Sequence, residues 1–496
     1  MTIFAGKRRN EMRKVISIEN GVTRHPQYRL SQPLTLDIYE GEHVAIVGPN
    51  GGGKSMLVDM LTGRYPLLLN NKVKYDFGEG ASNLASDNIK YISFRDSYGD
   101  ADGNYYYQQR WNSQDVDDTP IVGNLLPECK NEELKETLYA LFGVEEMVDK
   151  HVILLSSGEL RKFQLTKTLI TGPRVLIMDN PFIGLDAKTR EQLANLLREL
   201  IKLTNLQVIL VLSKTDDIPD FITHVIQVEH KTFLGKITID EFLGNQRPVP
   251  PHLLSEEKRQ SILSLPYSDD LYKTERVVEL NKVSIRYGSR TILKELDWTV
   301  RSGEKWALCG DNGSGKSTLL SLVCADNPQS YACDISLFDR KRGSGESIWE
   351  IKRHIGYVSP EMHRAYKKNL PVIDIVASGL HDSIGLYKKT HDEDRAKCEW
   401  WLDIFGIGTF KDKNFLQLSS GEQRLVLVAR AFVKDPELLI LDEPLHGLDL
   451  YNRRLVKDVI ETFCQRRDKT LIMVTHYRDE LPNVIDHELR LVKSEE

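Results

Sequence analysis

The 496-residue sequence lacks three features that would each assign it to a large class of proteins. Its six cysteines form no CxxC pair, which argues against a zinc site or disulfide scaffold and indicates a reducing, intracellular location. No apolar run approaches the roughly 18 residues of a membrane span, and the N-terminus has no apolar signal region, so we expect neither membrane insertion nor secretion. There is also no basic excess: 66 Lys and Arg against 72 Asp and Glu give a net charge of −6. This balance argues against nonspecific coating of nucleic acid.

An internal repeat is the main positive feature of the chain. Four short motifs each occur twice, in the same order: Gly48–Ser55 and Gly310–Ser317, Leu155–Glu159 and Leu418–Glu422, Leu176–Asp179 and Leu439–Asp442, and Gly184–Asp186 and Gly447–Asp449. The first pair lies 262 positions apart and the other three pairs 263. One common register indicates two copies of a single domain, rather than the three domains that length alone would suggest. We place the copies at residues 1–245 and 276–496.

The stretch between the copies, residues 246–275, reads as a linker. It holds Pro248, Pro250 and Pro251 and then a charged run, with one short helix expected over Ser255–Leu263. As a flexible coil of about 5–6 Å × √n, some 30 residues would span about 30 Å. That reach allows the two copies to close on each other within one chain, and pairing between two chains stays open as the alternative.

Each copy repeats one order of elements. An apolar strand (Val44–Val47 or Trp306–Leu308) precedes the glycine-rich motif, a polar helical insert follows, and two further apolar strands come after the serine-glycine motif. Strands that alternate with helices predict an α/β fold, with a mixed, mainly parallel sheet between helices. The sequence therefore predicts two tandem P-loop NTPase domains. In each domain the phosphate loop is the glycine-rich motif that follows the first apolar strand.

Both glycine-rich motifs fit G-x-x-x-x-G-K-[ST], a loop whose backbone N–H groups turn toward a phosphate at a helix N-terminus. Lys54 and Lys316 would reach the β- and γ-phosphates, and Ser55 and Ser317 would ligate Mg²⁺. The predicted nucleotide-binding residues are Gly48, Asn50, Gly51, Gly53, Lys54, Ser55 and Met56 in the first copy, and Gly310, Asn312, Gly313, Ser314, Gly315, Lys316, Ser317 and Thr318 in the second.

The residues that end the later strands distinguish the two copies. Asp179 and Asp442 each end an apolar strand, where a carboxylate can join the Mg²⁺ shell; a simple helix N-cap is the alternative reading. The second copy continues with Glu443, which can accept a proton from an attacking water, whereas the first has Asn180, whose amide cannot. The second copy also has His476 after its last buried strand, where the first has Ser213. The pattern predicts one hydrolytic site, with Lys316, Glu443 and His476 as catalytic residues, and one weakened site.

These motifs together resemble ATP-binding cassette (ABC) ATPases over nearly the whole chain. Stretches such as Arg342–Lys352 and Ile355–Ser359 are similar to the ModF/PhrA-type tandem cassettes, known as molybdenum-transport or photorepair ATP-binding proteins. The resemblance implies ATPase activity with ATP and Mg²⁺ as cofactors. It also implies head-to-tail pairing, in which each phosphate loop faces the signature motif of the other copy.

Carried onto this sequence, the resemblance makes Ser156, Ser157, Gly158 and Glu159 one signature and Ser419, Ser420, Gly421 and Glu422 the other. A helix N-cap is the structural alternative for these serines. The family places an adenine-stacking aromatic near Tyr287, although an ordinary packed tyrosine fits that position equally well, and His25 and Tyr28 stand near the matching place in the first copy. The metal ligands implied are Ser55, Asp179, Ser317 and Asp442.

One departure from the family concerns a glutamine that usually links Mg²⁺ to the partner protein. The corresponding stretches contain Phe94 in the first copy and Glu361 in the second, and neither has glutamine. Glu361 can make a polar contact and Phe94 cannot. The insert also carries an aromatic cluster, Asn104–Trp111, which suits a packed helix face, base stacking or a partner contact.

Three functions fit these observations. The first is the energy-coupling subunit of an ABC transporter, molybdate-related by the family name, which is cytoplasmic and peripheral on the inner face of the membrane beside a separate permease. The second is a soluble ATPase that remodels a ribosome or nucleic-acid complex. The third is a slow, nucleotide-gated regulator, which the Asn180 and Ser213 replacements would suit.

Overall fold

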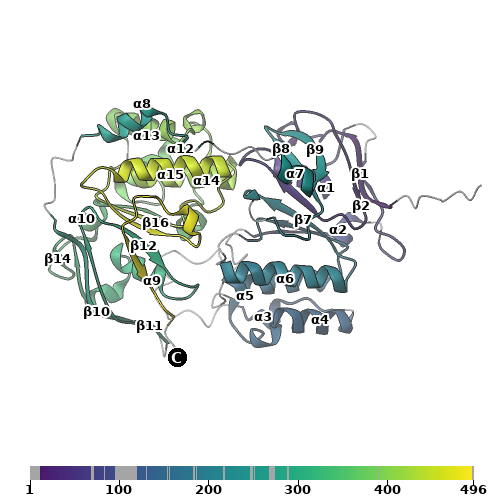
Figure 1. The fold of residues 1–496 in the computed structure, drawn as a ribbon, viewed down its shortest axis with the longest axis horizontal. Helices are drawn as coiled ribbons and strands as arrows, with labels where there is room; N and C mark the ends of the chain where they lie inside the picture. The colour runs from purple at the N-terminus through teal and green to yellow at the C-terminus, as the bar shows by residue number, and fades with distance from the viewer. Residues whose placement is uncertain are drawn as a thin grey trace, which may run out of the picture.

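The computed structural model describes residues 12–68, 72–82, 84–94, 120–129, 131–152, 155, 157–182, 185, 187–215, 218–245, 250, 252–266, 274–287, 290–388 and 390–493. The ribbon has two halves that lie side by side, the first in purple and teal and the second in green and yellow (Figure 1). Every sheet takes its strands from one half alone. The predicted cluster Asn104–Trp111 lies outside the described residues.

The first half contains a six-stranded sheet in the order β5-β6-β7-β3-β8-β9 and a three-stranded antiparallel sheet β2-β1-β4. Its strands are β1 Lys14–Gly21, β2 Leu34–Tyr39, β3 Val44–Val47, β4 Lys74–Tyr75, β5 Ile89–Ser93, β6 Val175–Asp179, β7 Gln207–Leu212, β8 His224–Glu229 and β9 Thr232–Thr238. Its helices are α1 Lys54–Leu61, α2 Ala85–Asn88, α3 Val122–Leu125, α4 Glu132–Phe142, α5 Ser157–Leu169, α6 Ala187–Leu203 and α7 Ile239–Gly244. In the larger sheet only β9 runs antiparallel to its neighbour.

The second half repeats this plan with a parallel five-stranded sheet, β15-β16-β17-β12-β18, and an antiparallel sheet β11-β10-β13-β14. Its strands are β10 Arg276–Tyr287, β11 Arg290–Arg301, β12 Lys305–Cys309, β13 Asp334–Leu337, β14 Arg340–Lys341, β15 Ile355–Val358, β16 Leu438–Asp442, β17 Thr470–Val474 and β18 His487–Arg490. Its helices, after α8 Glu256–Leu263, are α9 Lys316–Val323, α10 Ile348–Lys352, α11 Pro360–Ala365, α12 Val372–Ala377, α13 Asp392–Ile404, α14 Ser420–Phe432 and α15 Leu450–Cys464.

The α/β architecture predicted from the sequence is confirmed, with one addition. Each half carries a separate antiparallel sheet besides its central sheet, which the sequence pattern did not reveal. The central strands are apolar on both faces: along β16, Leu438 and Ile440 pack into one core, and Leu439 and Leu441 into another. Successive side chains of a strand point to opposite faces, so a strand between two cores is apolar throughout.

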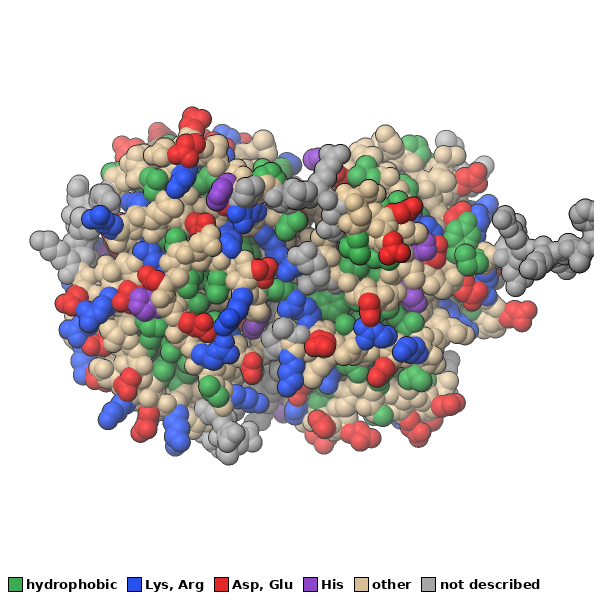
Figure 2. All heavy atoms as spheres, viewed as in Figure 1, with side chains coloured by type: hydrophobic (Ala, Val, Ile, Leu, Met, Phe, Trp, Pro, Cys, Tyr) green, Lys and Arg blue, Asp and Glu red, His purple; other side chains and the backbone are tan. Residues whose placement is uncertain are grey.

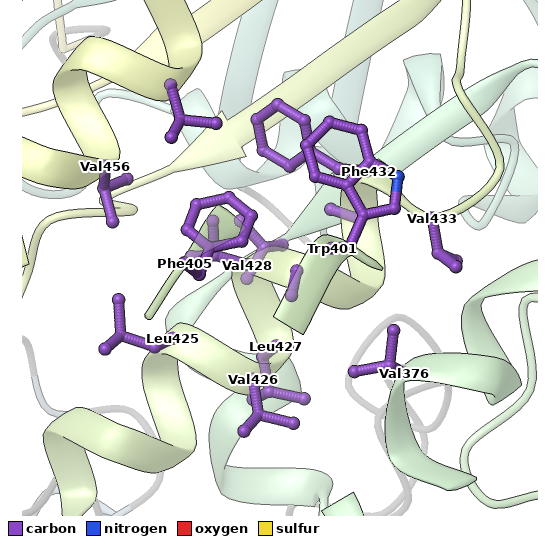
Figure 3. Packing of buried hydrophobic residues seen from close by; sticks show 14 of the residues in the cluster. Val376, Trp401, Phe405, Leu425, Val426, Leu427, Val428, Phe432, Val433 and Val456 are labelled. Carbon is purple, nitrogen blue, oxygen red and sulfur yellow. The ribbon is translucent and has the colours of Figure 1, made fainter. Parts of the chain in front are cut away.

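The largest core lies under the helices of the second half (Figure 3). Trp401 of α13 has its ring 5.1 Å from that of Phe432 on α14, and Phe405 lies 5.5 Å from Phe432. All three rings are buried. Edge and tilted ring contacts of this kind add to the free energy gained from burying the apolar area. This packing fixes α14, whose N-terminus is the second signature motif.

The described part of the linker packs against the second half. Helix α8 begins after Ser255, which accepts a hydrogen bond from the Lys258 backbone, and Ile262 is fully buried in the core that contains Trp401. The buried Asp458 of α15 accepts hydrogen bonds from the backbone N–H groups of Leu253, at 2.6 Å, and Leu254. Figure 1 shows α8 beside α13 and α15. The flexible-coil estimate of its reach is therefore wrong for residues 252–266, because this segment is folded onto one half.

The surface carries both signs of charge. On the face in Figure 2, Asp and Glu gather along the lower edge of the first half, over α3 and α4, while Lys and Arg gather on the second half beside the boundary between the halves. Neither half presents a uniformly basic surface on this face. Among the helices that the structure describes, none is both long and apolar enough to cross a membrane.

Candidate functional site

Both phosphate loops lie at the carboxyl end of a central strand, the usual ligand edge of a parallel sheet. The first follows β3 and the second follows β12. Gly48 has φ +156°, and a Cβ placed on it would lie 1.9 Å from the Val228 carbonyl oxygen, so only glycine fits this turn. Gly53 and Gly315 have left-handed φ angles of 107° and 97° and directly precede helices α1 and α9. The sequence therefore forms the same loop twice.

The loop lysines hold matching positions. Lys54 Nζ donates to the carbonyl oxygens of Gly48, at 2.7 Å, and Pro49; Lys316 Nζ donates to those of Gly310, at 2.7 Å, and Asp311. Burial lowers the pKa of Lys54 to about 8, partly offset by the nearby carboxylates of Asp179 and Asp449. A desolvated ammonium held over a ring of backbone N–H groups is suited to bind an anion.

In the second half, each carboxylate oxygen of Glu443 contacts a different histidine. Its Oε1 lies 2.9 Å from Nε2 of His476, and its Oε2 lies 2.9 Å from Nδ1 of His446. Burial alone would raise the pKa of Glu443, but the hydrogen bonds from the two histidines hold that pKa well below its usual value. Glu443 and His476 were assigned to one site from the sequence, but this direct contact was not predicted. The contact with His446 was not predicted either.

Asp442, the last residue of β16, is buried beside the Glu443 carboxylate. Burial, and then the nearby carboxyl groups of Glu361 and Glu443, raise the pKa of Asp442 well above its usual value. The Arg424 guanidinium donates to the Glu443 carbonyl oxygen and offsets part of this effect. The three carboxyl groups and Lys316 place both signs of charge at the mouth of the second phosphate loop.

The corresponding residues of the first half form a closed polar network. Asn180 donates from Nδ2 to Asp179 Oδ1 at 2.9 Å and accepts at Oδ1 from the Ser213 backbone N–H at 3.1 Å. The second oxygen of Asp179 accepts from the Tyr91 hydroxyl at 2.9 Å. The Ser213 hydroxyl in turn donates to Oδ1 of Asn50 on the phosphate loop, at 3.3 Å. Apart from the Asp179 carboxylate, whose two oxygens already accept hydrogen bonds, these side chains offer no base that could take a proton from water.

The first phosphate loop faces the second half directly. Asn50 donates from its backbone N–H to Asp449 Oδ2 at 2.8 Å and from Nδ2 to the Gly447 carbonyl oxygen at 3.1 Å. A Cβ on Gly421 would lie 1.9 Å from Asn50 Nδ2, and one on Gly51 would lie 2.8 Å from Glu422 Oε1. Head-to-tail contact at this loop is therefore made within one chain.

Ser419 caps α14 through a capping box with Glu422: its Oγ accepts from the Glu422 backbone, and Glu422 Oε2 accepts from the Ser419 backbone at 2.7 Å. The N-cap role weighed for this serine is present, and the same helix N-terminus points at the opposite phosphate loop. Of the first signature, Ser156 lies outside the described residues. Its helix α5 begins at Ser157, and Glu159 pairs with Lys150 at 2.7 Å. The partner side of the second loop therefore stays a prediction.

Three further positions singled out in the sequence have partners within the fold. Tyr287 is half-buried against the core of the second half, and its hydroxyl accepts a hydrogen bond from Asn327 Nδ2 at 3.0 Å. Tyr28 stacks on Tyr65 with ring centroids 4.5 Å apart. Phe94 is buried under the Arg161 guanidinium, 4.6 Å from its ring centroid. Adenine stacking by Tyr287 stays a prediction.

The two halves also share a cavity of about 40 Å³ between their catalytic edges. Asn180, Ser213 and Lys214 line it from the first half, and Glu443, His446, His476 and Tyr477 from the second. Tyr477 lies within cation–π distance of Lys214, 3.8 Å, and Arg190, 4.1 Å, which both belong to the first half. The residues that follow the central strands of both halves therefore face the same small space.

Comparison with known proteins agrees with this geometry. The ABC transporter family model matches residues 31–183 and 293–446, which are the two halves in turn. The ABC transporter ATP-binding protein ModF of Escherichia coli K12 is 37% identical over 486 residues, covering 94% of this chain and 95% of the relative. An uncharacterised ABC transporter ATP-binding protein of Schizosaccharomyces pombe is 27% identical over 489 residues, covering 96% and 97%.

Solved structures share the tandem fold. The archaeal ribosome recycling factor aABCE1, in complex with ribosomal stalk protein aP1, has a TM-score of 0.54 at 20% identity, covering 95% of this chain and 87% of that one. A model of ribosome-bound archaeal Pelota and ABCE1 gives 0.58 at 20% identity, covering 95% and 76%. At this identity the likeness concerns the fold alone. The chain matches the family model twice, has two phosphate loops and shares 37% identity with a relative over nearly the full length of both proteins. It therefore belongs to the ABC transporter family of ATP-binding proteins and is a tandem ABC ATPase.

Proposed function

We propose that the two nucleotide sites of this ATPase are unequal, with hydrolysis mainly at the site of Lys316, Glu443 and His476. The observation that carries this proposal is the carboxylate of Glu443, held by two imidazoles, at the position where the first half has Asn180. A carboxylate can accept a proton as water attacks the γ-phosphate, whereas an amide only orients the water. The site of Lys54 and Asn180 binds ATP and hydrolyses it slowly or not at all.

Mg²⁺ fits the second site better than the first. There, Asp442 lies buried beside two more carboxyl groups, and its raised pKa shows that a compensating cation would stabilise its charge. Ser317 and Asp442 are the residues that would hold the ion, which neutralises phosphate charge when bound. In the first site both oxygens of Asp179 already accept hydrogen bonds, from Asn180 and Tyr91. Ser55 and Asp179 would have to give up part of this network to bind Mg²⁺.

The first site would serve as the stable contact between the halves. Its phosphate loop already touches Gly421, Gly447 and Asp449 of the second half. ATP bound between Lys54 and the N-terminus of α14 would strengthen that contact, because a helix N-terminus attracts phosphate. Slow turnover here would keep the halves joined while hydrolysis at the other site opens and closes them.

For the wider role, we propose that the chain is the energy-coupling subunit of an ABC transporter and works with a separate permease. The similarity to a protein named ABC transporter ATP-binding protein, across nearly both full lengths, supports this role. The molybdate cargo suggested by the resemblance stays a prediction. The alternative is an ATPase that remodels a ribosome or nucleic-acid complex. It is favoured by the structural neighbours, which are a ribosome recycling factor and ribosome-bound ABCE1, and by Phe94, which lies buried where the family has its partner-linking glutamine.

A trapping experiment separates these two roles. The Glu443→Gln variant should hold ATP at the second site and remain closed on its partner, so it is used as bait with Mg²⁺ and ATP. The matched control is Glu443→Gln combined with Lys316→Ala, which should not retain ATP there. An integral membrane protein recovered only with the first bait would support the transporter role. Recovery of ribosomes, RNA or DNA instead would replace that role with the remodelling one.

A further inference from the structure

The Glu443 carboxylate is held by a different histidine at each oxygen. His476 Nε2 lies 2.9 Å from Oε1, and His446 Nδ1 lies 2.9 Å from Oε2. The three side chains are 16%, 8% and 13% exposed, for Glu443, His476 and His446 in turn. An ionised carboxylate only accepts hydrogen bonds, so each of the two facing nitrogens carries a hydrogen. The catalytic carboxylate is therefore fixed by two donors from two separate segments.

His446 is not explained by packing or by a second polar contact. Its Nε2 is buried and has no hydrogen-bond partner in the part of the chain that the structure describes. The single bond to Glu443 thus orients the ring. A buried polar atom without a partner is energetically unfavourable, so the site holds His446 at a cost to stability. Its neighbour Gly447 accepts from Asn50, so His446 lies at the contact between the halves.

The sequence offers a matched comparison for this residue. Subtracting the repeat offset of 263 from His446 gives Ile183, and subtracting it from Glu443 gives Asn180. The carboxylate and its extra donor are present together in one half and replaced together in the other. An isoleucine can offer no hydrogen bond. This pairing is expected if the histidine serves the carboxylate.

We propose that His446 is a positioning residue for ATP hydrolysis. It holds Oε2 of Glu443 when His476 turns to the γ-phosphate, so that Oε1 of Glu443 stays directed at the attacking water. The inference rests on the proposed function, in which Glu443 is the base and His476 contacts the phosphate. With only one histidine, that turn would leave the carboxylate free to rotate. A displacement of about 1 Å at a reacting group can lower a rate about a hundredfold. His446 keeps one oxygen fixed throughout.

Steady-state ATP hydrolysis by the full chain tests this role with two substitutions. His446→Leu removes the donor, and we expect kcat to fall about 10–100-fold, the loss seen when a group that orients a functional side chain is removed. His446→Asn keeps a donor near the Nδ1 position, and we expect it to restore most of that loss. KM for ATP should change less than about twofold in both, because His446 touches the carboxylate rather than the phosphate loop.

The decisive measurement is the turnover of the double variant, in which His446→Leu is combined with Glu443→Gln. In a Glu443→Gln background His446→Leu should lower turnover no further, because residues that act as a unit are not additive. Equal kcat for the Leu and Asn variants, or an additional loss in the Glu443→Gln background, would overturn the inference. If Glu443→Gln itself leaves turnover intact, the proposed function fails instead. His391→Leu, which removes an exposed imidazole outside both sites, serves as the control and should match the unmodified chain.

Discussion

The two halves share one scaffold and differ at a few side chains. In both, the phosphate loop follows a central strand and the helix after it begins at the loop lysine. The residues after β6 and β16 even share an unusual backbone, with φ of 51° at Asn180 and 49° at Glu443. Asparagine tolerates this left-handed conformation more readily than glutamate does. Retaining glutamate there indicates that its carboxylate is needed, so the comparison separates what the fold requires from what the chemistry requires.

The polar partners sharpen this contrast. Asp179 in the first half has its two oxygens hydrogen-bonded to Asn180 and Tyr91. Asp442 in the second half is buried near Glu361 and Glu443, and burial first and then these two carboxyl groups raise its pKa. The Asp179 oxygens already accept hydrogen bonds within the chain, whereas the Asp442 carboxylate is the one that we propose a cation would stabilise. The scaffold is repeated, while the electrostatics of the two sites are opposite.

The largest effect should come from Glu443→Gln, which removes the base without changing the size of the side chain. We expect kcat for ATP hydrolysis to fall by about two to four orders of magnitude, the usual contribution of a positioned base. Single-turnover and steady-state phosphate release would measure it. A loss of less than tenfold would mean that the first half carries the reaction.

The next largest difference should separate the two loop lysines. Lys316→Ala should lower turnover about 10²–10³-fold, because it removes the ammonium group that stabilises negative charge on the phosphoryl group during its transfer. Lys54→Ala should lower turnover less than about tenfold while weakening ATP binding at the first site. Measuring the hydrolysis rate and the number of nucleotides bound per chain for both variants would show which lysine matters more for turnover. The reverse order would assign the active site to the other half.

A stability difference is expected from the linker, which packs on the second half only. Asp458→Ala should destabilise that half by about 2 kcal/mol, because the Leu253 and Leu254 N–H groups lose their acceptor. Denaturant unfolding followed by tryptophan fluorescence suits this test, since five of the six tryptophans lie beyond residue 276. Asp412→Ala, at a carboxylate that is 75% exposed, is the matched control. Equal midpoints for the two variants would show that the packing of residues 252–266 adds nothing to stability.

The smallest effect should come from Asn180→Gln. The amide is retained at a site without a base, so hydrolysis should change less than about twofold. The same assay as for Glu443→Gln measures it. Losses of similar size from the two substitutions would remove the asymmetry between the halves altogether.

Much of the fold could be predicted from the repeat and from the motifs that end each strand. The parallel central sheets follow from strand–helix alternation. The family resemblance placed Glu443 and His476 in one site, but their direct contact was not predicted. The antiparallel sheets were not predicted. The pairing of β10 with the adjacent strand β11 was missed, and β10 also pairs with β13, from which β11, β12 and α9 separate it in the chain. Strand pairing over such a separation leaves no local signature. His446 was missed because it precedes a helix in a loop motif and resembles an ordinary loop residue.

The sequence by itself determined the two copies, their phosphate loops and the replacement of Glu443 and His476 by Asn180 and Ser213, because these depend on local glycines, strand ends and residue type. Tertiary structure alone decided which groups meet across the halves, such as Asn50 with Asp449 and Tyr477 with Lys214. It also decided that the linker helix packs on the second half. These contacts join segments far apart in the chain, and only the packed arrangement sets the distances that make them hydrogen bonds or cation–π contacts.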